Sequence, residues 1–340
     1  MDRSRMSLSL PRPRAVLMGP QRLAPIVDQA LELLDVPADG RVAVITAGWQ
    51  EREDEDEELM AALGGRPGVN LRLHARGDAV YHDDHELFVE HRARQDRLKD
   101  LQNLYRRRLS HAMAAAAEMH GLHVKGTTES THNRDILADQ RDGAIDWVQK
   151  LDDEHVRLTS AIDERFDRDM QPLSRPAVAS QRAELLALLD ACHAVAIAGG
   201  HVAVLRNKLA LFGLADALAR LPIVAWSAGA MVLTERIVLF HDTPPQGRGF
   251  AEVLGAGFAL MPGVVVLPHA RRRLLLDDRS RISLFARRFL PRTCVTLDER
   301  CYLAHFQGDL GGGMWRLSAL ARRMHGDGSC TAVDDSGGAP

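Results

Sequence analysis

The sequence predicts an α/β fold in which a doubly wound, mostly parallel sheet carries an inserted helical hairpin. Seven short runs are rich in β-branched residues and apolar nearly throughout, which is typical of strands covered on both faces. Helical patterns separate most of these runs, and alternation of strands and helices indicates a parallel sheet. The runs comprise residues 15–18, 41–46, 69–73, 194–198, 223–226, 264–267 and 295–297.

The connections between the runs complete this expected domain. Helices are predicted over residues 23–34 and 182–189, each of which leads from one strand toward the next. The last run, 295–297, is followed closely by an apolar stretch at 302–306, which indicates a hairpin at the edge of the sheet. We therefore expect a single α/β domain over residues 14–325.

A charged segment from about residue 83 to residue 170 breaks the alternation. It has few β-branched residues, and its pattern predicts one helix over 86–120 that ends near Gly121 and a second over 134–168. We interpret the segment as a helical hairpin inserted in the domain, and as a lid, a dimer contact or a structural addition. An apolar stripe at three- and four-residue spacing supports the first helix. The stripe consists of Leu98, Leu101, Leu104, Tyr105 and Leu109.

The composition excludes several classes of protein. With 43 basic and 46 acidic residues the net charge is −3, whereas a general nucleic-acid binder is expected to be basic. No apolar run approaches the roughly 20 residues of a membrane span. Residues 1–14 are polar and rich in Arg and Pro, unlike a secretory signal. Residues 326–340 are rich in Gly, Ser and Asp, which predicts a disordered tail.

The cysteines indicate a reducing compartment. The chain has four, at positions 192, 294, 301 and 330, and none forms a CxxC pair. This spacing argues against a disulfide framework and against a structural zinc site. We therefore expect the protein to be cytoplasmic.

The stretch from Ile223 to Met231 has the pattern of a nucleophile elbow. An apolar run ends in Ser227, and the small residues Ala225, Ala228 and Gly229 surround that serine. A serine on a tight turn between a strand and a helix needs small neighbours, because bulky ones would clash. The start of the helix supplies backbone N–H groups and a partial positive charge. An ordinary small-residue turn between a buried strand and a buried helix is the alternative.

A glycine pair precedes the elbow along the chain. Gly199 and Gly200 follow the run 194–198 and lie, in an open parallel sheet, at the edge where ligands bind. The Gly200 N–H and the Ala228 N–H are candidates for an oxyanion hole. An ordinary glycine-rich turn is the competing interpretation.

A histidine ends a later apolar strand. His269 follows Pro268 at the carboxyl end of the run 264–267, where a general base for Ser227 is expected. The acid that would orient His269 is either Asp242, which lies between serine and histidine, or Glu299, which follows the next strand. Either carboxylate is otherwise a solvated loop residue.

These residues together resemble the cyanophycinase and dipeptidase E family of serine peptidases. The resemblance extends from about residue 194 to residue 307 and rests on three motifs in order. The motifs are Gly199-Gly200-His201, with His201 in place of the usual Asn or Asp, Trp226-Ser227-Ala228-Gly229, and Pro268-His269. The resemblance implies a class I glutamine-amidotransferase-like fold and a Ser-His-acid triad that works without a cofactor. It places Asp242, or the pair Asp298-Glu299, as the acid.

Further residues are candidates for contacts with substrate. Gln50, Glu51 and Arg52 follow the strand 41–46 and are expected to face the same crevice, unless they only begin a helix. By the family resemblance, Arg279 and Arg281 are placed to bind an aspartyl or β-aspartyl carboxylate, and a guanidinium matches that group. A solvated helix face is the alternative for these arginines. His201 is a further candidate because of its place in the glycine loop.

No metal site is expected. The sequence His-Asp-Asp-His-Glu at 82–86 fits no standard zinc spacing. An Asp83 or Asp84 that caps the following helix explains it better.

The sequence therefore predicts a cytoplasmic serine-type peptidase that cleaves a small peptide or isopeptide, with a homodimer left open. The alternative is a non-catalytic domain of the same fold that binds a small ligand or a partner protein. A glutamine amidase or acyltransferase fits less well because the nucleophile is serine rather than cysteine. An α/β-hydrolase fits less well because its histidine normally comes last in the chain.

Overall fold

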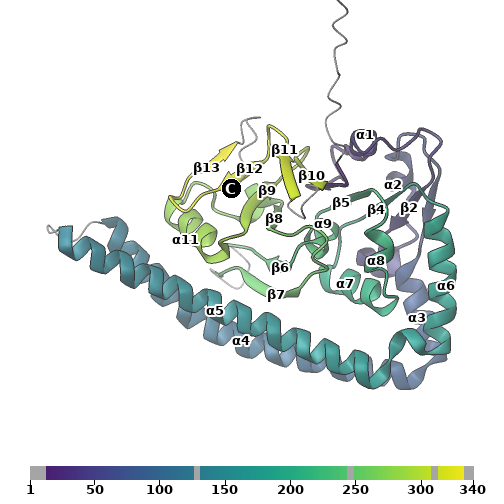
Figure 1. The fold of residues 1–340 in the computed structure, drawn as a ribbon, viewed down its shortest axis with the longest axis horizontal. Coiled ribbons are helices and arrows are strands. Elements are labelled where there is room, and N and C mark those ends of the chain that lie inside the picture. The colour runs from purple at the N-terminus through teal and green to yellow at the C-terminus, as the bar shows by residue number, and fades with distance from the viewer. Residues whose placement is uncertain (1–12, 126–130, 243–248, 308–312, 333–340) are drawn as a thin grey trace, which may run out of the picture.

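The computed structural model describes residues 13–125, 131–242, 249–307 and 313–332 (Figure 1). It has a mixed α/β architecture with a mostly parallel central sheet. A second, smaller sheet lies beside the first, and two long helices run along one side of the molecule (Figure 1). The predicted α/β class and its mostly parallel sheet are confirmed.

The central sheet has seven strands in the order β11-β10-β1-β5-β4-β2-β3. Five of them are parallel, and β10 and β11 continue the sheet as antiparallel strands beyond β1. All residues of β1, β2, β4 and β5 are buried, which explains their apolar composition. The strands are β1 (Ala15–Met18), β2 (Val42–Ile45), β3 (Gly68–Asn70), β4 (Ala194–Ile197), β5 (Ile223–Trp226), β10 (Tyr302–Gln307) and β11 (Gly313–Leu317).

Helices cover both faces of this sheet. Along β1, Ala15 and Leu17 belong to one core cluster, and Val16 and Met18 belong to the other. Helices α1 and α2 pack on the second face, and α3, α6, α7, α8 and α9 pack on the first. Their bounds are α1 (Val27–Leu33), α2 (Glu57–Ala61), α3 (Leu73–Asp83), α6 (Pro176–Asp190), α7 (Val202–Leu211), α8 (Ala215–Leu218) and α9 (Ala228–Leu233).

The strand that precedes His269 does not belong to the central sheet. It forms a four-stranded sheet of order β13-β12-β9-β8, in which β8 and β9 are parallel. Strands β6 and β7 form a separate antiparallel pair. The elements are β6 (Arg236–Leu239), β7 (Glu252–Ala256), β8 (Val264–Pro268), α10 (Ala270–Arg273), α11 (Arg279–Phe289), β9 (Thr293–Leu297), β12 (Arg322–Met324) and β13 (Cys330–Ala332).

Two expectations about the carboxyl-terminal part are wrong. The predicted hairpin between residues 295–297 and 302–306 does not form, because β10 pairs with β1 and β11 while β9 pairs with β8 and β12. The predicted disordered tail begins too early, because β13 pairs with β12 within it. The rest of that tail, residues 333–340, lies outside the described residues.

One predicted strand is shorter than expected. The run 69–73 divides into β3 and the start of α3 at Leu73. The buried carboxylate of Glu53 accepts hydrogen bonds from the N–H groups of His74 and Ala75, at 2.9 and 2.8 Å. These bonds satisfy first-turn donors of α3 and start the helix within an apolar stretch.

The inserted helical hairpin is present and longer than expected. Helix α4 (His85–Lys125) and helix α5 (Thr131–Met170) pack side by side and extend beyond α11 (Figure 1). Helix α4 continues through Gly121, where the sequence predicted its end; a glycine in a helix costs only about 1 kcal/mol. The Asp84 carboxylate accepts the Leu87 N–H at 3.0 Å, which confirms the predicted helix cap.

A buried polar network fastens the hairpin to the body. The Arg288 guanidinium on α11 donates to both carboxylate oxygens of Asp152 on α5, each at 2.8 Å. The Tyr105 hydroxyl on α4 donates to Asp152 at 2.8 Å and accepts the Val253 N–H of β7 at 3.1 Å. Because Arg288 and Asp152 are almost fully buried, this network ties both hairpin helices to β7 and α11. These contacts favour the structural addition over the lid.

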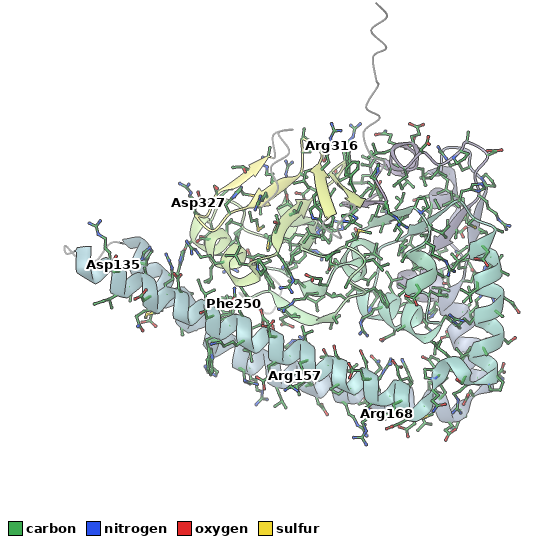
Figure 2. All side chains as sticks on the ribbon, viewed as in Figure 1. Asp135, Arg157, Arg168, Phe250, Arg316 and Asp327 are labelled. Atoms are coloured by element: carbon green, nitrogen blue, oxygen red, sulfur yellow. The ribbon has the colours of Figure 1, made fainter. Side chains whose placement is uncertain are left out.

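Charged side chains cover the outer faces of both long helices (Figure 2). Asp135, Arg157 and Arg168 mark the far end, the middle and the base of α5 in that view, and all three are exposed. Within the described residues, no helix is both long and apolar enough to cross a membrane.

Candidate active site

Ser227 occupies a strained turn between β5 and α9. Its backbone has φ 50° and ψ −120°, a conformation that L-residues rarely adopt. The Ser227 N–H donates to the Met18 carbonyl at 3.2 Å, and the Ser227 carbonyl accepts the Met231 N–H at 3.1 Å. These bonds hold the turn at the carboxyl ends of β1 and β5. This geometry is that of the elbow predicted from the sequence.

Two glycines allow the elbow to lie against the end of β4. A Cβ on Gly199 would come within 2.8 Å of the Ser227 Cβ. A Cβ on Gly229 would come within 2.3 Å of the Ile197 carbonyl oxygen. Since real Cβ atoms do not approach other atoms so closely, a larger residue at either position would displace the serine.

His269 lies beside Ser227. It joins β8 to α10 in a left-handed conformation, with φ 59° and ψ 34°, and its N–H donates to the Leu297 carbonyl at 3.1 Å. The His269 Nε2 lies 3.4 Å from the Ser227 Oγ. This distance is at the long end of a hydrogen bond, as is common in catalytic pairs without substrate.

The surroundings of His269 favour its neutral form. Partial burial lowers the pKa of the imidazole, and the nearby charges of Arg273 and Arg272 lower it further, while Asp298 and Glu299 oppose the shift. A neutral imidazole can accept a proton from a serine hydroxyl at neutral pH.

The carboxylates near His269 are those of Asp298 and Glu299, which follow β9. Asp298 is mostly buried and accepts the Arg271 N–H at 3.0 Å, whereas Glu299 is exposed. Burial raises the pKa of Asp298. In the described part of the chain, no carboxylate is hydrogen-bonded or ion-paired to the His269 imidazole.

Asp242 belongs to a different cluster. Its carboxylate accepts the Leu275 N–H at 2.8 Å and forms an ion pair with Arg281, which also donates to the Gly249 carbonyl at 3.1 Å. These contacts direct Asp242 and Arg281 toward each other and toward nearby backbone, and none of them involves Ser227 or His269. Arg279 is exposed on α11.

The Asp242–Arg281 pair lines a pocket that lies apart from the serine. The pocket opens between α4, α11 and the segment before β7, and neither Ser227 nor His269 lines it. Its walls are largely apolar, with Met113, Phe250 and Phe285 among them. Phe250 lies next to the hairpin (Figure 2).

The predicted oxyanion-hole residues, Gly200 and Ala228, belong to the glycine loop and to the start of α9. The Ala228 N–H has no acceptor within α9, because the first helical bond is the one from Met231 to Ser227. Gly200, with φ 109°, lies in the loop that packs against the elbow. The positions of Gly200 and Ala228 are therefore compatible with the predicted oxyanion hole.

His201 caps a helix. Its Nδ1 accepts the Val204 N–H at 3.3 Å at the start of α7, and its own N–H donates to the Gly48 carbonyl at 2.7 Å. The imidazole thus supplies the N-cap acceptor that Asn or Asp usually provides. This role explains how a histidine is accommodated there, while contact with substrate stays a prediction.

The candidate substrate-binding residues in the loop after β2 lie in different surroundings. Arg52 is exposed and pairs with Glu55, so its guanidinium is directed along the loop. Gln50 is half-buried and has the unusual backbone angles φ 60° and ψ −125°. The effect of Arg273 on the pKa of His269 and the burial of Glu53 were not predicted from the sequence. The three consecutive arginines after His269 were the signal available for the first of these.

Comparisons with known proteins add little to this site. The chain matches no protein-family model and no curated protein sequence. Among the solved structures that align with the chain is a peptidase from an acI-B1 Actinobacterium. The alignment covers 62% of this chain and 84% of that one, at 14% identity and a TM-score of 0.30. This likeness is too low to assign a function. Across the described residues, no group of three or more His, Cys, Asp or Glu side chains is arranged to hold a metal.

Proposed function

We propose that this protein is a serine-type peptidase that cleaves a small peptide or isopeptide. The observation that carries the proposal is the 3.4 Å approach of the His269 Nε2 to the hydroxyl of Ser227, a serine held on a strained elbow. A nucleophile beside a neutral base, at the start of a helix, is the arrangement that acyl transfer requires.

The reaction follows from the positions of these groups. The Ser227 Oγ attacks the substrate carbonyl while His269 takes the hydroxyl proton. His269 then gives that proton to the leaving amine, and water hydrolyses the acyl-enzyme by the same route. The Gly200 and Ala228 N–H groups stabilise the oxyanion, a contribution of roughly 3–4 kcal/mol per donor in known cases.

For the acid, we favour the pair Asp298-Glu299 over Asp242. The carboxylates of Asp298 and Glu299 oppose the lowering of the His269 pKa, so they stabilise the imidazolium that forms when Ser227 is deprotonated. Asp242 is taken up by Arg281 and the Leu275 N–H. Glu299, one of the two acids predicted from the sequence, therefore stays a candidate together with its neighbour.

The proposal extends to the fold and to the family of peptidases. The glycine loop, the elbow and the Pro-His pair support a class I glutamine-amidotransferase-like fold with a cyanophycinase- or dipeptidase E-like site. An aspartyl or β-aspartyl substrate gains no support from Arg281, whose guanidinium is paired with Asp242.

Labelling with a fluorophosphonate probe tests the proposal. We expect the wild type and Ser280→Ala, which removes an exposed serine on α11, to be labelled alike, and Ser227→Ala to resist labelling. Circular dichroism establishes that each variant is folded. A folded wild type that resists the probe as fully as Ser227→Ala would favour the alternative, a non-catalytic domain that binds a ligand.

A further inference from the structure

The loop after β2 contains a second strained residue close to the elbow. Gln50 has φ 60° and ψ −125°, and Ser227 has φ 50° and ψ −120°. A glycine would adopt this backbone at no steric cost, whereas a glutamine is strained. Strain of this kind persists only where the surroundings impose it, and it is concentrated at functional sites.

The glycine loop at Gly199 and Gly200 lies between the Gln50 loop and the serine. Strands β2, β4 and β5 are neighbours in the sheet, so their carboxyl ends lie side by side. A Cβ on Gly48 would come within 2.4 Å of the Gly199 carbonyl oxygen, and one on Gly200 within 2.3 Å of the Gly48 carbonyl oxygen. A Cβ on Gly199 would in turn come within 2.8 Å of the Ser227 Cβ. The loop that contains Gln50 therefore packs against the glycine loop, which in turn packs against the elbow of Ser227.

Buried hydrogen bonds behind the loop impose its shape. Glu53 is 3% exposed, and its carboxylate is held by the N–H groups that start α3. The Glu53 carbonyl accepts from the Thr46 hydroxyl and from the Asn70 amide, each at 3.0 Å. The Glu53 N–H donates to the Gln50 carbonyl at 3.0 Å. None of these bonds involves the Gln50 side chain, so the fold itself does not account for a glutamine there.

We propose that Gln50 is a substrate-orienting residue whose carboxamide pairs with a peptide unit of the substrate. The inference rests on the proposed function. A carboxamide both donates and accepts hydrogen bonds, and so does a peptide unit, whereas a simple ester has no N–H. The substrate class is therefore a peptide that offers an amide near the scissile bond.

The test compares Gln50→Gly with Gln171→Gly. Gln171 is also a glutamine with positive φ, at 45°, but it lies at the end of α5 and is exposed. Both substitutions relieve strain but also give the unfolded chain more conformational freedom, so we expect them to change the melting temperature alike, by no more than about 2 °C. Only Gln50→Gly is expected to raise KM for peptide substrates, by about tenfold, as the loss of one hydrogen bond does.

The same two variants distinguish a role of Gln50 in orienting the substrate from a general disruption of the active site. In Gln50→Gly, hydrolysis of a small ester without an N–H, and the rate of fluorophosphonate labelling, are expected to remain at wild-type values. Gln50→Glu keeps the shape but loses the donor, and is expected to raise the peptide KM as well. An unchanged peptide KM in Gln50→Gly, or an equal loss on peptide, ester and probe, overturns the inference. A wild type that the probe does not label overturns the proposed function first.

Discussion

The Ser227 Oγ lies 3.4 Å from the His269 Nε2, although the two residues come from different sheets. Ser227 follows β5 of the central sheet, and His269 follows β8 of the four-stranded sheet. Gly19, directly after β1, donates its N–H to the Cys301 carbonyl at 3.0 Å, which extends the pairing of β1 with β10 in the central sheet. Gly19 also lies against the residue that follows β9 of the other sheet. A Cβ on Gly19 would come within 1.9 Å of the Asp298 carbonyl oxygen.

Replacement of Gly19 by alanine is expected to separate these sheets. The new Cβ would meet backbone, which can only shift, so we expect a loss of about 1–3 kcal/mol in the free energy of unfolding and slower labelling of Ser227. Gly143→Ala, in α5 with no atom within 4 Å of the new Cβ, is the matched control and is expected to gain up to about 1 kcal/mol. Urea denaturation and the labelling rate measure both effects. Normal labelling of Gly19→Ala would contradict this account of the interface.

The pH dependence of activity is expected to follow Arg273. Because His269 works as a base when neutral, activity should rise with pH through a pKa below the ordinary 6.5. Burial is the main cause of the low pKa and Arg273 the second, so Arg273→Met should move the acidic limb of kcat/KM to higher pH. Arg220→Met, which removes an exposed arginine that faces Asp190, should leave the limb in place. Identical profiles for the two variants would show that Arg273 does not act on His269.

Two of the candidate acids, Asp298 and Asp242, are expected to respond differently to neutralisation. Asp298→Asn removes a charge that favours the imidazolium, so the acidic limb should move to lower pH and kcat should fall by roughly tenfold. Asp242→Asn should instead mainly destabilise the fold, by about 1–3 kcal/mol, because Arg281 loses its ionised partner. Steady-state kinetics and thermal denaturation distinguish these outcomes. A stable Asp242→Asn protein without activity would restore Asp242 as the acid.

The hairpin is expected to depend on its buried ion pair. Arg288→Met leaves the Asp152 carboxylate buried without its cation and should cost about 3–5 kcal/mol in the free energy of unfolding. Arg108→Ala breaks a far more exposed pair with Glu154 and should cost much less stability. Urea denaturation compares the two. Similar small losses would mean that the hairpin is not fastened through Arg288.

Acid sensitivity is expected to arise partly from His91. Burial, helped by Arg94 and Lys208, lowers the pKa of this imidazole to about 3. Between pH 6.5 and about 3 the unfolded chain therefore binds a proton that the folded chain does not. As the pH is lowered through this range, the free energy of unfolding decreases by up to about 1.4 kcal/mol per pH unit.

His91→Phe is the test of that dependence. Phenylalanine keeps the aromatic contacts with Tyr81 and Phe166 and cannot titrate, so the variant should lose less stability than the wild type between pH 7 and pH 5. His82→Phe, at an exposed position on α3, is the control and should follow the wild type. Equal slopes for all three proteins would rule out His91 as a source of the acid sensitivity.

Local pattern was sufficient to predict the five parallel strands of the central sheet and the two long helices. The strands at Ala15–Met18 and Ile223–Trp226 have the predicted bounds, because a short apolar run between turn residues has few alternatives to a buried strand. The hairpin helices were recognised from their charge and their apolar stripe, of which Tyr105 and Leu109 are buried and Leu104 is exposed. The carboxyl end of the first helix was not predicted, because packing between α4 and α5 carries that helix through Gly121.

For the site, the chain order of residues determined which side chains are available, and tertiary structure decided which of them meet. A strand-end serine among small residues and a strand-end histidine were both evident from the sequence, and the fold places them together. Only the tertiary structure assigned Asp242 to Arg281, placed Asp298 and Glu299 near His269, and put β8 in a second sheet. The physical reason is that a backbone turn, or the burial of a strand, depends mainly on residues that are neighbours in sequence. An ion pair or a pairing of strands joins segments far apart in sequence, and a local pattern does not show which of the possible partners is the most stable.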